Sequence, residues 1–178
     1  MGKYMIVYLP SKEVTKYNQQ LVEEVGPKFA ENYLIENPRP PYITLKSPFY
    51  MEDTSTMETA LANFVKKCKP AEVELDGFGS FNSKVSYLKI NFSAEAIQIQ
   101  KELLKEISNF KEIYLKEFDT EFKPHLTVAY GNTPEIFDNI WEYLQQMPQP
   151  NFKMKFDNIT LLKKVKNEWQ IYKEFKIK

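Results

Sequence analysis

The chain has 178 residues, enough for one compact domain or for two small lobes that share a core. Its 24 basic residues balance its 24 acidic residues, so the net charge gives no general attraction to nucleic acid or to membranes. The single cysteine, Cys68, excludes an internal disulfide and a zinc site built on cysteines, and the N-terminal residues lack the apolar stretch of a signal peptide. We therefore expect a cytoplasmic protein with no metal, no cofactor and no membrane partner.

The first half of the chain begins with a strand pattern followed by a helix pattern. The apolar run Tyr4–Leu9 predicts a strand, and Ser11 is placed to cap a helix that reaches Val25. Gly26-Pro27 is expected to end that helix. The proline-rich segment before Tyr42 then enforces an extended approach to a second strand, which we expect to end at Pro48.

A second helix and a strand pair complete the first half. A capping box at Ser55 begins a helix that ends before Pro70. The segments 72–75 and 85–92 predict an antiparallel pair, separated by the turn-rich segment 76–80. Ser93 is then placed to begin a third helix, which extends to about residue 107.

The second half repeats this order of elements. A strand over 122–130 precedes a helix that begins at Thr133-Pro134, and three strand patterns follow, at 152–156, 159–162 and 169–177. We predict an α+β fold for residues 1–178, a single domain made of two pseudo-symmetric lobes. Each lobe would be an antiparallel-rich sheet with helices on its outer face, and a central cleft would separate the two.

Two short segments nearly repeat each other: Pro41-Tyr42-Ile43-Thr44-Leu45 and Pro124-His125-Leu126-Thr127-Val128. In an extended strand, positions two apart share a face, so each segment would present a polar pair to one side. The pairs are Tyr42 with Thr44 and His125 with Thr127. The repeat predicts a shared site, although β-branched residues also suit strands for structural reasons alone.

These residue types suit phosphoryl chemistry. Histidine is the side chain that exchanges protons near neutral pH, and threonine hydroxyls bind phosphoryl oxygens. Two proton-transfer groups on opposite sides of a phosphorus suit in-line displacement, because one activates the attacking oxygen while the other protonates the leaving one. No metal is needed where a neighbouring ribose hydroxyl is the nucleophile or leaving group.

The chain resembles the two-histidine (2H) phosphoesterase superfamily, which includes the bacterial 2′-5′ RNA ligase and cyclic phosphodiesterase group. Members contain two His-x-Thr motifs on strands of two pseudo-symmetric lobes. The segment 124–128 matches the second motif fully, and 41–49 matches the first motif except at Tyr42. The resemblance continues through 75–81 and through the closing hairpin at 161–175, so it covers nearly the whole chain.

The resemblance implies a catalytic role for His125, Thr127 and Thr44, with Tyr42 at the position of the second proton-transfer group. A tyrosine of ordinary pKa is a poor base at neutral pH, so Tyr42 is expected to donate a proton, to stack on a base or only to line the cleft. We assign Lys46, Phe49 and Tyr130 to substrate binding. Some relatives have a basic residue near the position of Tyr130.

Three functions are consistent with these features. The first is a metal-independent phosphoesterase, weakened by Tyr42, that acts on a 2′,3′-cyclic phosphate or a 2′-5′ linkage in RNA or a small nucleotide. The second is a catalytically silent protein that binds a nucleotide or an RNA end, and the third is a protein scaffold. We expect a monomer in each case.

Overall fold

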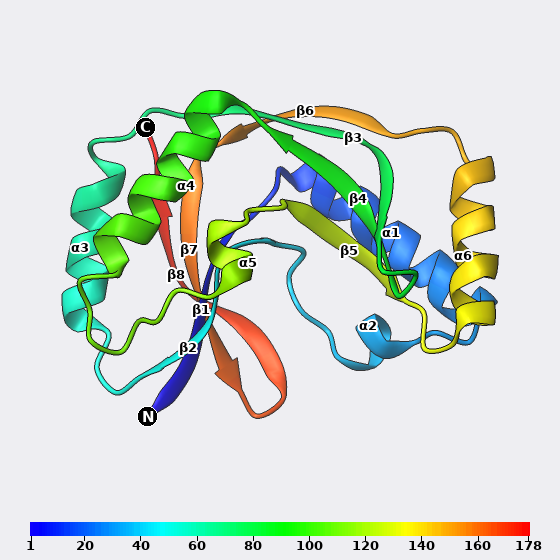
Figure 1. The fold of residues 1–178 in the computed structure, drawn as a ribbon, viewed down its shortest axis with the longest axis horizontal. Coiled ribbons are helices and arrows are strands. Elements are labelled where there is room, and N and C mark those ends of the chain that lie inside the picture. The colour runs from blue at the N-terminus through cyan, green and yellow to red at the C-terminus, as the bar shows by residue number, and fades with distance from the viewer.

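A computed structural model describes residues 1–178 as two four-stranded antiparallel sheets with helices packed around them (Figure 1). The first sheet has the strand order β2-β1-β7-β8, and its strands are β1 (Gly2–Tyr8), β2 (Ile43–Met51), β7 (Asn158–Val165) and β8 (Glu168–Lys176). The second has the order β5-β4-β3-β6, and its strands are β3 (Ala71–Phe81), β4 (Val85–Phe92), β5 (His125–Tyr130) and β6 (Asn151–Phe156). The helices are α1 (Lys12–Lys28), α2 (Tyr33–Glu36), α3 (Ser55–Val65), α4 (Ala94–Ile107), α5 (Glu117–Thr120) and α6 (Pro134–Gln146).

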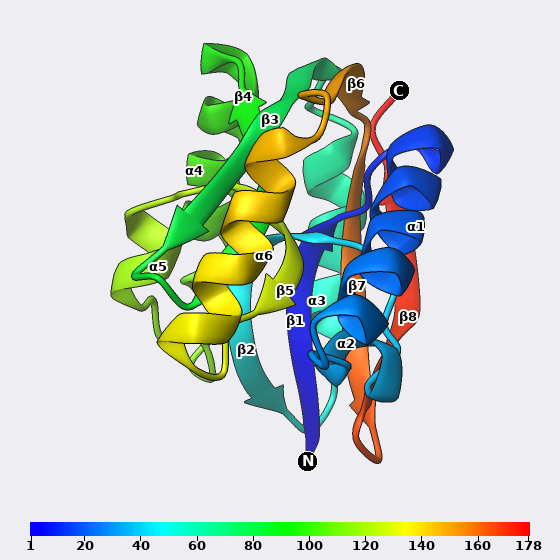
Figure 2. The same ribbon diagram turned by 90° about the vertical axis from the view of Figure 1, so that its right-hand side faces the viewer.

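The predicted pair of similar lobes is confirmed. Each sheet places its motif strand, β2 or β5, at one edge, and these two edge strands contact each other between the sheets. Helices α3 and α4 lie together at one end of the molecule, whereas α1 and α6 lie at the other (Figures 1 and 2). The arrangement directs both polar-pair segments toward the space between the sheets.

The two lobes share one hydrophobic core. A single cluster of 38 buried residues includes Ile6 and Leu45 from the first sheet together with Leu75 and Leu126 from the second. Burial of so much contiguous apolar surface is the main term that holds the sheets in a fixed relation. The geometry of the cleft is therefore set by the core beneath it.

Ser11, Ser93 and Thr133 cap helices α1, α4 and α6 as predicted. The predicted capping box at Ser55 is wrong, because Ser55 is already the first residue of α3 and its N-cap, Thr54, makes no side-chain cap bond.

The predicted ends of α1, β2 and β3 are also wrong. Helix α1 continues through Pro27, because Phe29 N–H still bonds the Val25 carbonyl and closes the last turn. Strand β2 continues through Pro48, which an edge strand tolerates since one side of its backbone needs no ladder partner. Strand β3 continues through the predicted turn, where a register shift and Gly77 at φ +77° absorb the irregularity.

Both motif strands contain a bulge directly after the motif threonine. The pairing with β1 passes from Thr44 to Lys46 with one shift of register, and the pairing with β4 passes from Thr127 to Ala129 in the same way. A bulge reverses the alternation of side chains beyond it. Residues that follow the threonine therefore face opposite to the direction that simple alternation predicts, and Tyr130 is turned toward the cleft.

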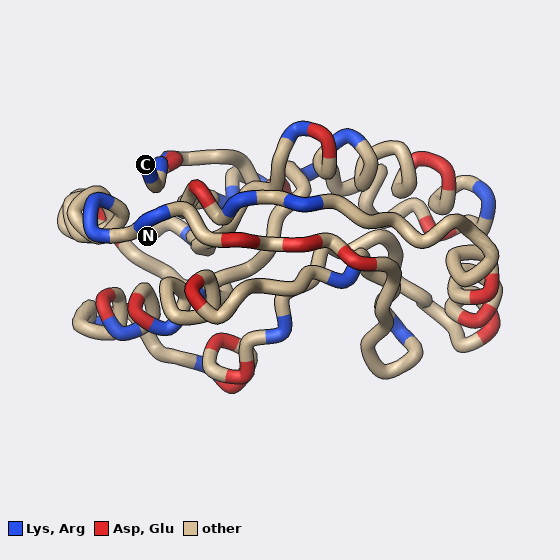
Figure 3. Tube along the Cα trace, turned by 90° about the horizontal axis from the view of Figure 1, so that it is seen from above, with Lys and Arg blue, Asp and Glu red and all other residues tan.

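The lysines of β6 do not form an open basic surface. Lys155 lies opposite Glu72 and Lys153 opposite Glu74 on the neighbouring strand, and Lys155 Nζ is 2.5 Å from a Glu72 carboxylate oxygen. In Figure 3, blue and red stretches lie side by side on two adjacent strands that face the viewer, which agrees with this pairing. Such cross-strand pairing stabilises the register of an edge strand. No helix is both long and apolar enough to cross a membrane.

Candidate active site

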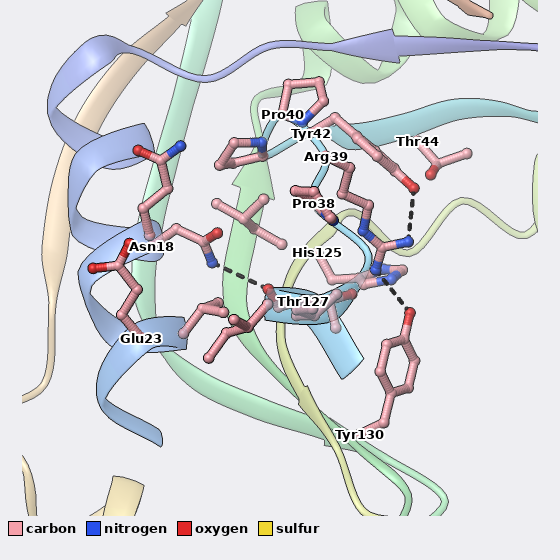
Figure 4. A pocket seen from close by; sticks show the side chains of 16 residues that line it. Asn18, Glu23, Pro38, Arg39, Pro40, Tyr42, Thr44, His125, Thr127 and Tyr130 are labelled. Carbon is pink, nitrogen blue, oxygen red and sulfur yellow. Dashed lines mark hydrogen bonds between the residues drawn. The ribbon is translucent and has the colours of Figure 1, made fainter. Parts of the chain in front are cut away.

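The two motif strands meet at a cavity of about 320 Å³, which is large enough for a small ligand. Its walls are β2, β5, one face of α1, the short helix α2 and the proline-rich segment before β2 (Figure 4). Four of the predicted site residues line it together: Tyr42, Thr44, His125 and Thr127. Tyr130, at the end of β5, also lines it.

A backbone carbonyl of its own chain fixes the tautomer of the neutral His125 ring. Its Nδ1 lies 2.8 Å from the carbonyl oxygen of Lys123, two residues earlier. Since a carbonyl can only accept a hydrogen bond, Nδ1 must bear the proton. The neutral ring then has its lone pair at Nε2, which is the form a general base requires.

Burial keeps His125 neutral. The rings of Phe81 and Tyr87 pack against the imidazole, with ring centroids 4.8 Å and 5.3 Å away. Burial lowers the pKa of His125 below its ordinary value of 6.5, and the bond to Lys123 offsets this only in part. At neutral pH the ring is therefore ready to accept a proton. Phe81 and Tyr87 do not line the cavity.

The two motif threonines have hydroxyls available to a ligand. Thr44 Oγ1 makes only a long contact of 3.9 Å to the Met5 sulfur, and the Thr127 hydroxyl has no partner in the protein. The backbone carbonyl of Thr127, by contrast, accepts a 3.1 Å bond from the buried side chain of Asn18 on α1. Asn18 thus holds the backbone of the edge strand β5 in place, and the hydroxyl of Thr127 remains available to a ligand.

Tyr42 occupies the position opposite His125 and is held by Arg39. Arg39 Nη1 lies 3.3 Å from the Tyr42 hydroxyl, and Nη2 lies 3.0 Å from the Tyr130 hydroxyl. Burial raises the pKa of Tyr42 above 10.0, although the guanidinium of Arg39 acts in the opposite direction. Tyr42 is therefore protonated at neutral pH and can donate a proton but not accept one.

Two predicted substrate contacts are corrected. Lys46 is fully buried, with its Nζ 2.9 Å from Asp119 and 3.0 Å from the Ser47 carbonyl, so it has no surface to offer a ligand. The bulge after Thr44 explains this, because it turns Lys46 away from the cavity. Phe49 is also buried, in the core beside Tyr4, and lines no part of the cavity.

Sequence reasoning missed two residues of the site, Arg39 and Asn18. Arg39 is the only arginine of the chain and stands three residues before Tyr42, a signal that could have marked it. Asn18 gives no such signal, because a polar residue in an amphipathic helix is ordinary. No group of three or more His, Cys, Asp or Glu side chains is placed to hold a metal ion.

Comparison with known proteins gives a consistent result. The sequence pattern of the 2′-5′ RNA ligase superfamily matches residues 10–168. A protein of Bacillus pumilus (strain SAFR-032) named "Putative phosphoesterase" is 24% identical, and the match covers 97% of this chain and 96% of that protein. A relative from Bacillus cytotoxicus with the same designation is 28% identical, with 97% and 95% covered.

Solved structures share the fold. The structure of TT0787 from Thermus thermophilus superposes with a TM-score of 0.68 at 16% identity, and the match covers 98% of this chain and 97% of that one. The structure of E. coli LigT complexed with 3′-AMP gives a TM-score of 0.59 at 14% identity, with 99% and 98% covered. The two-lobed architecture is therefore that of a known structural group.

Proposed function

This chain belongs to the 2′-5′ RNA ligase superfamily, and on that premise we propose that it is a phosphoesterase that uses this cavity. The proposed substrate is a 2′,3′-cyclic phosphate or a 2′-5′ phosphodiester of RNA or a small nucleotide. The observation that supports this most directly is the state of His125, a neutral base with Nδ1 bound to a carbonyl, in one cavity with Thr44 and Thr127.

The proposed reaction is an in-line displacement at phosphorus. His125 Nε2 takes a proton from a water molecule as the water oxygen bonds to the phosphorus of a cyclic phosphate. The hydroxyls of Thr44 and Thr127 donate to the non-bridging oxygens. As the bond to the leaving ribose oxygen breaks, Tyr42 donates its proton to that oxygen, and the neighbouring Arg39 stabilises the tyrosinate until the proton returns through solvent.

The relatives support a nucleotide substrate. E. coli LigT has been crystallised with 3′-AMP, with ATP and with NADP+, all of which are small phosphorylated nucleosides. A cavity of about 320 Å³ is large enough for the phosphate and ribose of such a ligand. The proposed reaction needs no metal ion, because both proton transfers are assigned to side chains.

Hydrolysis of 2′,3′-cyclic AMP and of 2′-5′ ApA by wild type, His125→Ala and His125→Gln tests the proposal. Loss of a proton-transfer group typically lowers a rate by about 10² to 10⁴-fold, and both variants are expected to show this. Circular dichroism of each variant controls for folding. Rates equal to wild type in both variants would contradict the catalytic role of His125.

A second function is favoured by one specific observation. The half-buried Tyr42 cannot replace a histidine as a base, and its raised pKa makes it a weak acid. The same cavity therefore also suits a protein that binds a nucleotide or an RNA end without turnover. Titration with a panel of cyclic and 2′-5′ nucleotides separates the functions, since a silent binder shows affinity without product on long incubation and a scaffold shows no affinity.

A further inference from the structure

Arg39 connects the two lobes at the cavity. It precedes β2 in the first lobe, and its two terminal nitrogens donate to tyrosine hydroxyls on opposite sides, Tyr42 before β2 and Tyr130 at the end of β5. Figure 4 shows the guanidinium between the hydroxyls of the two tyrosines.

Arg39 forms no salt bridge in the protein. The chain has six ion pairs and none of them involves Arg39. Glu23 lines the same cavity without pairing with it. A partly buried cation without a partner is unfavourable, so this position favours an anion.

The three side chains together present only donors. A guanidinium has five N–H groups, and two of them are used here. Each tyrosine hydroxyl accepts from Arg39 and therefore has its own proton free to donate. Two O–H groups and the remaining N–H groups thus point to a ligand that only accepts hydrogen bonds, and phosphate oxygens are such acceptors.

The geometry is held in place before any ligand binds. Arg39 stands between Pro38 and Pro40, which restrict its backbone to an extended conformation. Tyr130 is turned into the cleft by the bulge in β5, and the ring of Tyr33 packs edge-on against it at 5.2 Å. Less conformational freedom is lost on binding when the donors are ordered in this way.

We propose that Arg39, Tyr42 and Tyr130 form a phosphate clamp, in which Arg39 supplies the charge that the buried Lys46 cannot supply. The clamp would hold the phosphate from both lobes at once. Arg39 and Tyr130 would donate to a non-bridging oxygen, opposite the threonine hydroxyls, and Tyr42 would donate to the bridging ribose oxygen. The identity of the phosphate as part of a nucleotide rests on the proposed function, whereas the clamp itself does not require turnover.

Binding of inorganic phosphate and of 2′,3′-cyclic AMP, measured by isothermal titration calorimetry on the full chain, tests the clamp. Arg39→Gln is expected to weaken binding of both probes by about tenfold or more, because a charged hydrogen-bond partner is lost. Arg39→Lys retains the charge but not the paired N–H donors of the guanidinium, so its affinity should lie between those of Arg39→Gln and wild type. Tyr130→Phe should weaken binding by a few-fold, and Lys16→Gln, a charge loss at an exposed residue outside the cavity, should change it less than twofold.

If Arg39→Gln binds both probes within twofold of the wild-type affinity, the clamp is wrong. This holds even if the variant melts at a lower temperature, because Arg39 would then only stabilise the contact between the lobes. If Arg39→Gln fails to fold, Arg39→Lys and Tyr130→Phe decide the question by the same comparison. Arg39-dependent phosphate binding without turnover in wild type would refute the proposed catalysis and leave the clamp intact. Turnover that requires His125 but not Arg39 would refute the clamp and leave the catalytic role of His125 intact.

Discussion

Lys46 Nζ and Asp119 Oδ2 lie 2.9 Å apart with almost no exposure to solvent, the side chains being 0% and 2% exposed. Asp119 also accepts bonds from the backbone N–H groups of Ser47 and Lys116, at 2.7 Å and 2.8 Å. The carboxylate thereby joins β2, the strand of the first motif, to the short helix α5. None of these residues lines the cavity, and the network takes no part in the proposed chemistry.

Lys46→Met is expected to destabilise the protein by about 3–5 kcal/mol, because it leaves Asp119 buried without its counter-charge. Urea denaturation measures the change in the free energy of unfolding. Lys173→Met is the matched control, since Lys173 pairs with Glu58 while 50% exposed and should cost less than about 1 kcal/mol. Equal losses in the two variants would show that burial does not distinguish the pairs.

The same carboxylate predicts how the protein responds to acid. Burial raises the pKa of Asp119, but the bonds from Lys116, Ser47 and Lys46 outweigh it and leave the pKa below 3.8. A group whose pKa is lowered in the folded state stabilises that state above its unfolded pKa, and the stabilisation is lost as the pH falls through the folded value. Wild type should therefore lose more stability than Asp119→Asn as the pH falls below about 3.8, as measured by urea denaturation at a series of pH values.

The pH dependence of turnover should follow His125 and Tyr42. The base must be neutral, and burial lowers its pKa, so kcat/KM should fall on the acid side only below pH 6.5. The acid must be protonated, and the pKa of Tyr42 is raised above 10.0, so no alkaline decline is expected below that pH. A rate profile across this range checks both limits, and an acid limb above pH 6.5 would show that His125 is not buried in the working enzyme.

Tyr42→His is expected to raise turnover of 2′,3′-cyclic AMP by about tenfold or more. A histidine protonates a leaving oxygen far more readily near neutral pH than a tyrosine does. Tyr42→Phe removes the hydroxyl and retains the ring, and it should lower the rate if Tyr42 acts as the acid. An unchanged rate in Tyr42→Phe would assign the proton donation to solvent.

Thr44→Val and Thr127→Val should each weaken binding of 2′,3′-cyclic AMP by about tenfold or more. Each change removes one hydroxyl donor to a charged phosphate, a bond worth about 1.5–3 kcal/mol, without changing the side-chain volume much. Thr59→Val on the exposed face of α3 is the control and should have no effect. Affinities unchanged in both cavity variants would place the phosphate elsewhere.

The sequence predicts the two lobes and brings Tyr42, Thr44, His125 and Thr127 together correctly. The prediction is correct because the two motif strands have the same alternation of apolar and polar residues. Each strand buries its apolar face in the core, and the polar faces of the two strands then meet at the cavity. The strongest part of the prediction thus comes from comparing two segments of one chain.

The burial of Lys46 and the contact of Arg39 with Tyr130 could not be predicted from the sequence pattern. A bulge adds one residue to a strand, and no residue type in this segment indicates it. The direction of the Lys46 side chain could therefore not be predicted from its spacing to Thr44. The reach of Arg39 to Tyr130, 91 positions along the chain, depends on how the two sheets pack. Neither depends on local pattern.

The hydrogen bond from His125 to the carbonyl of Lys123 has a consequence for how this site can change over time. The acceptor belongs to the main chain, so no substitution at position 123 other than one that bends the chain can remove it. Substitutions of the Lys123 side chain therefore leave the tautomer of His125 unchanged. The opposite position depends entirely on the identity of one side chain, and it is there that a single codon change is enough to alter the chemistry of the cleft.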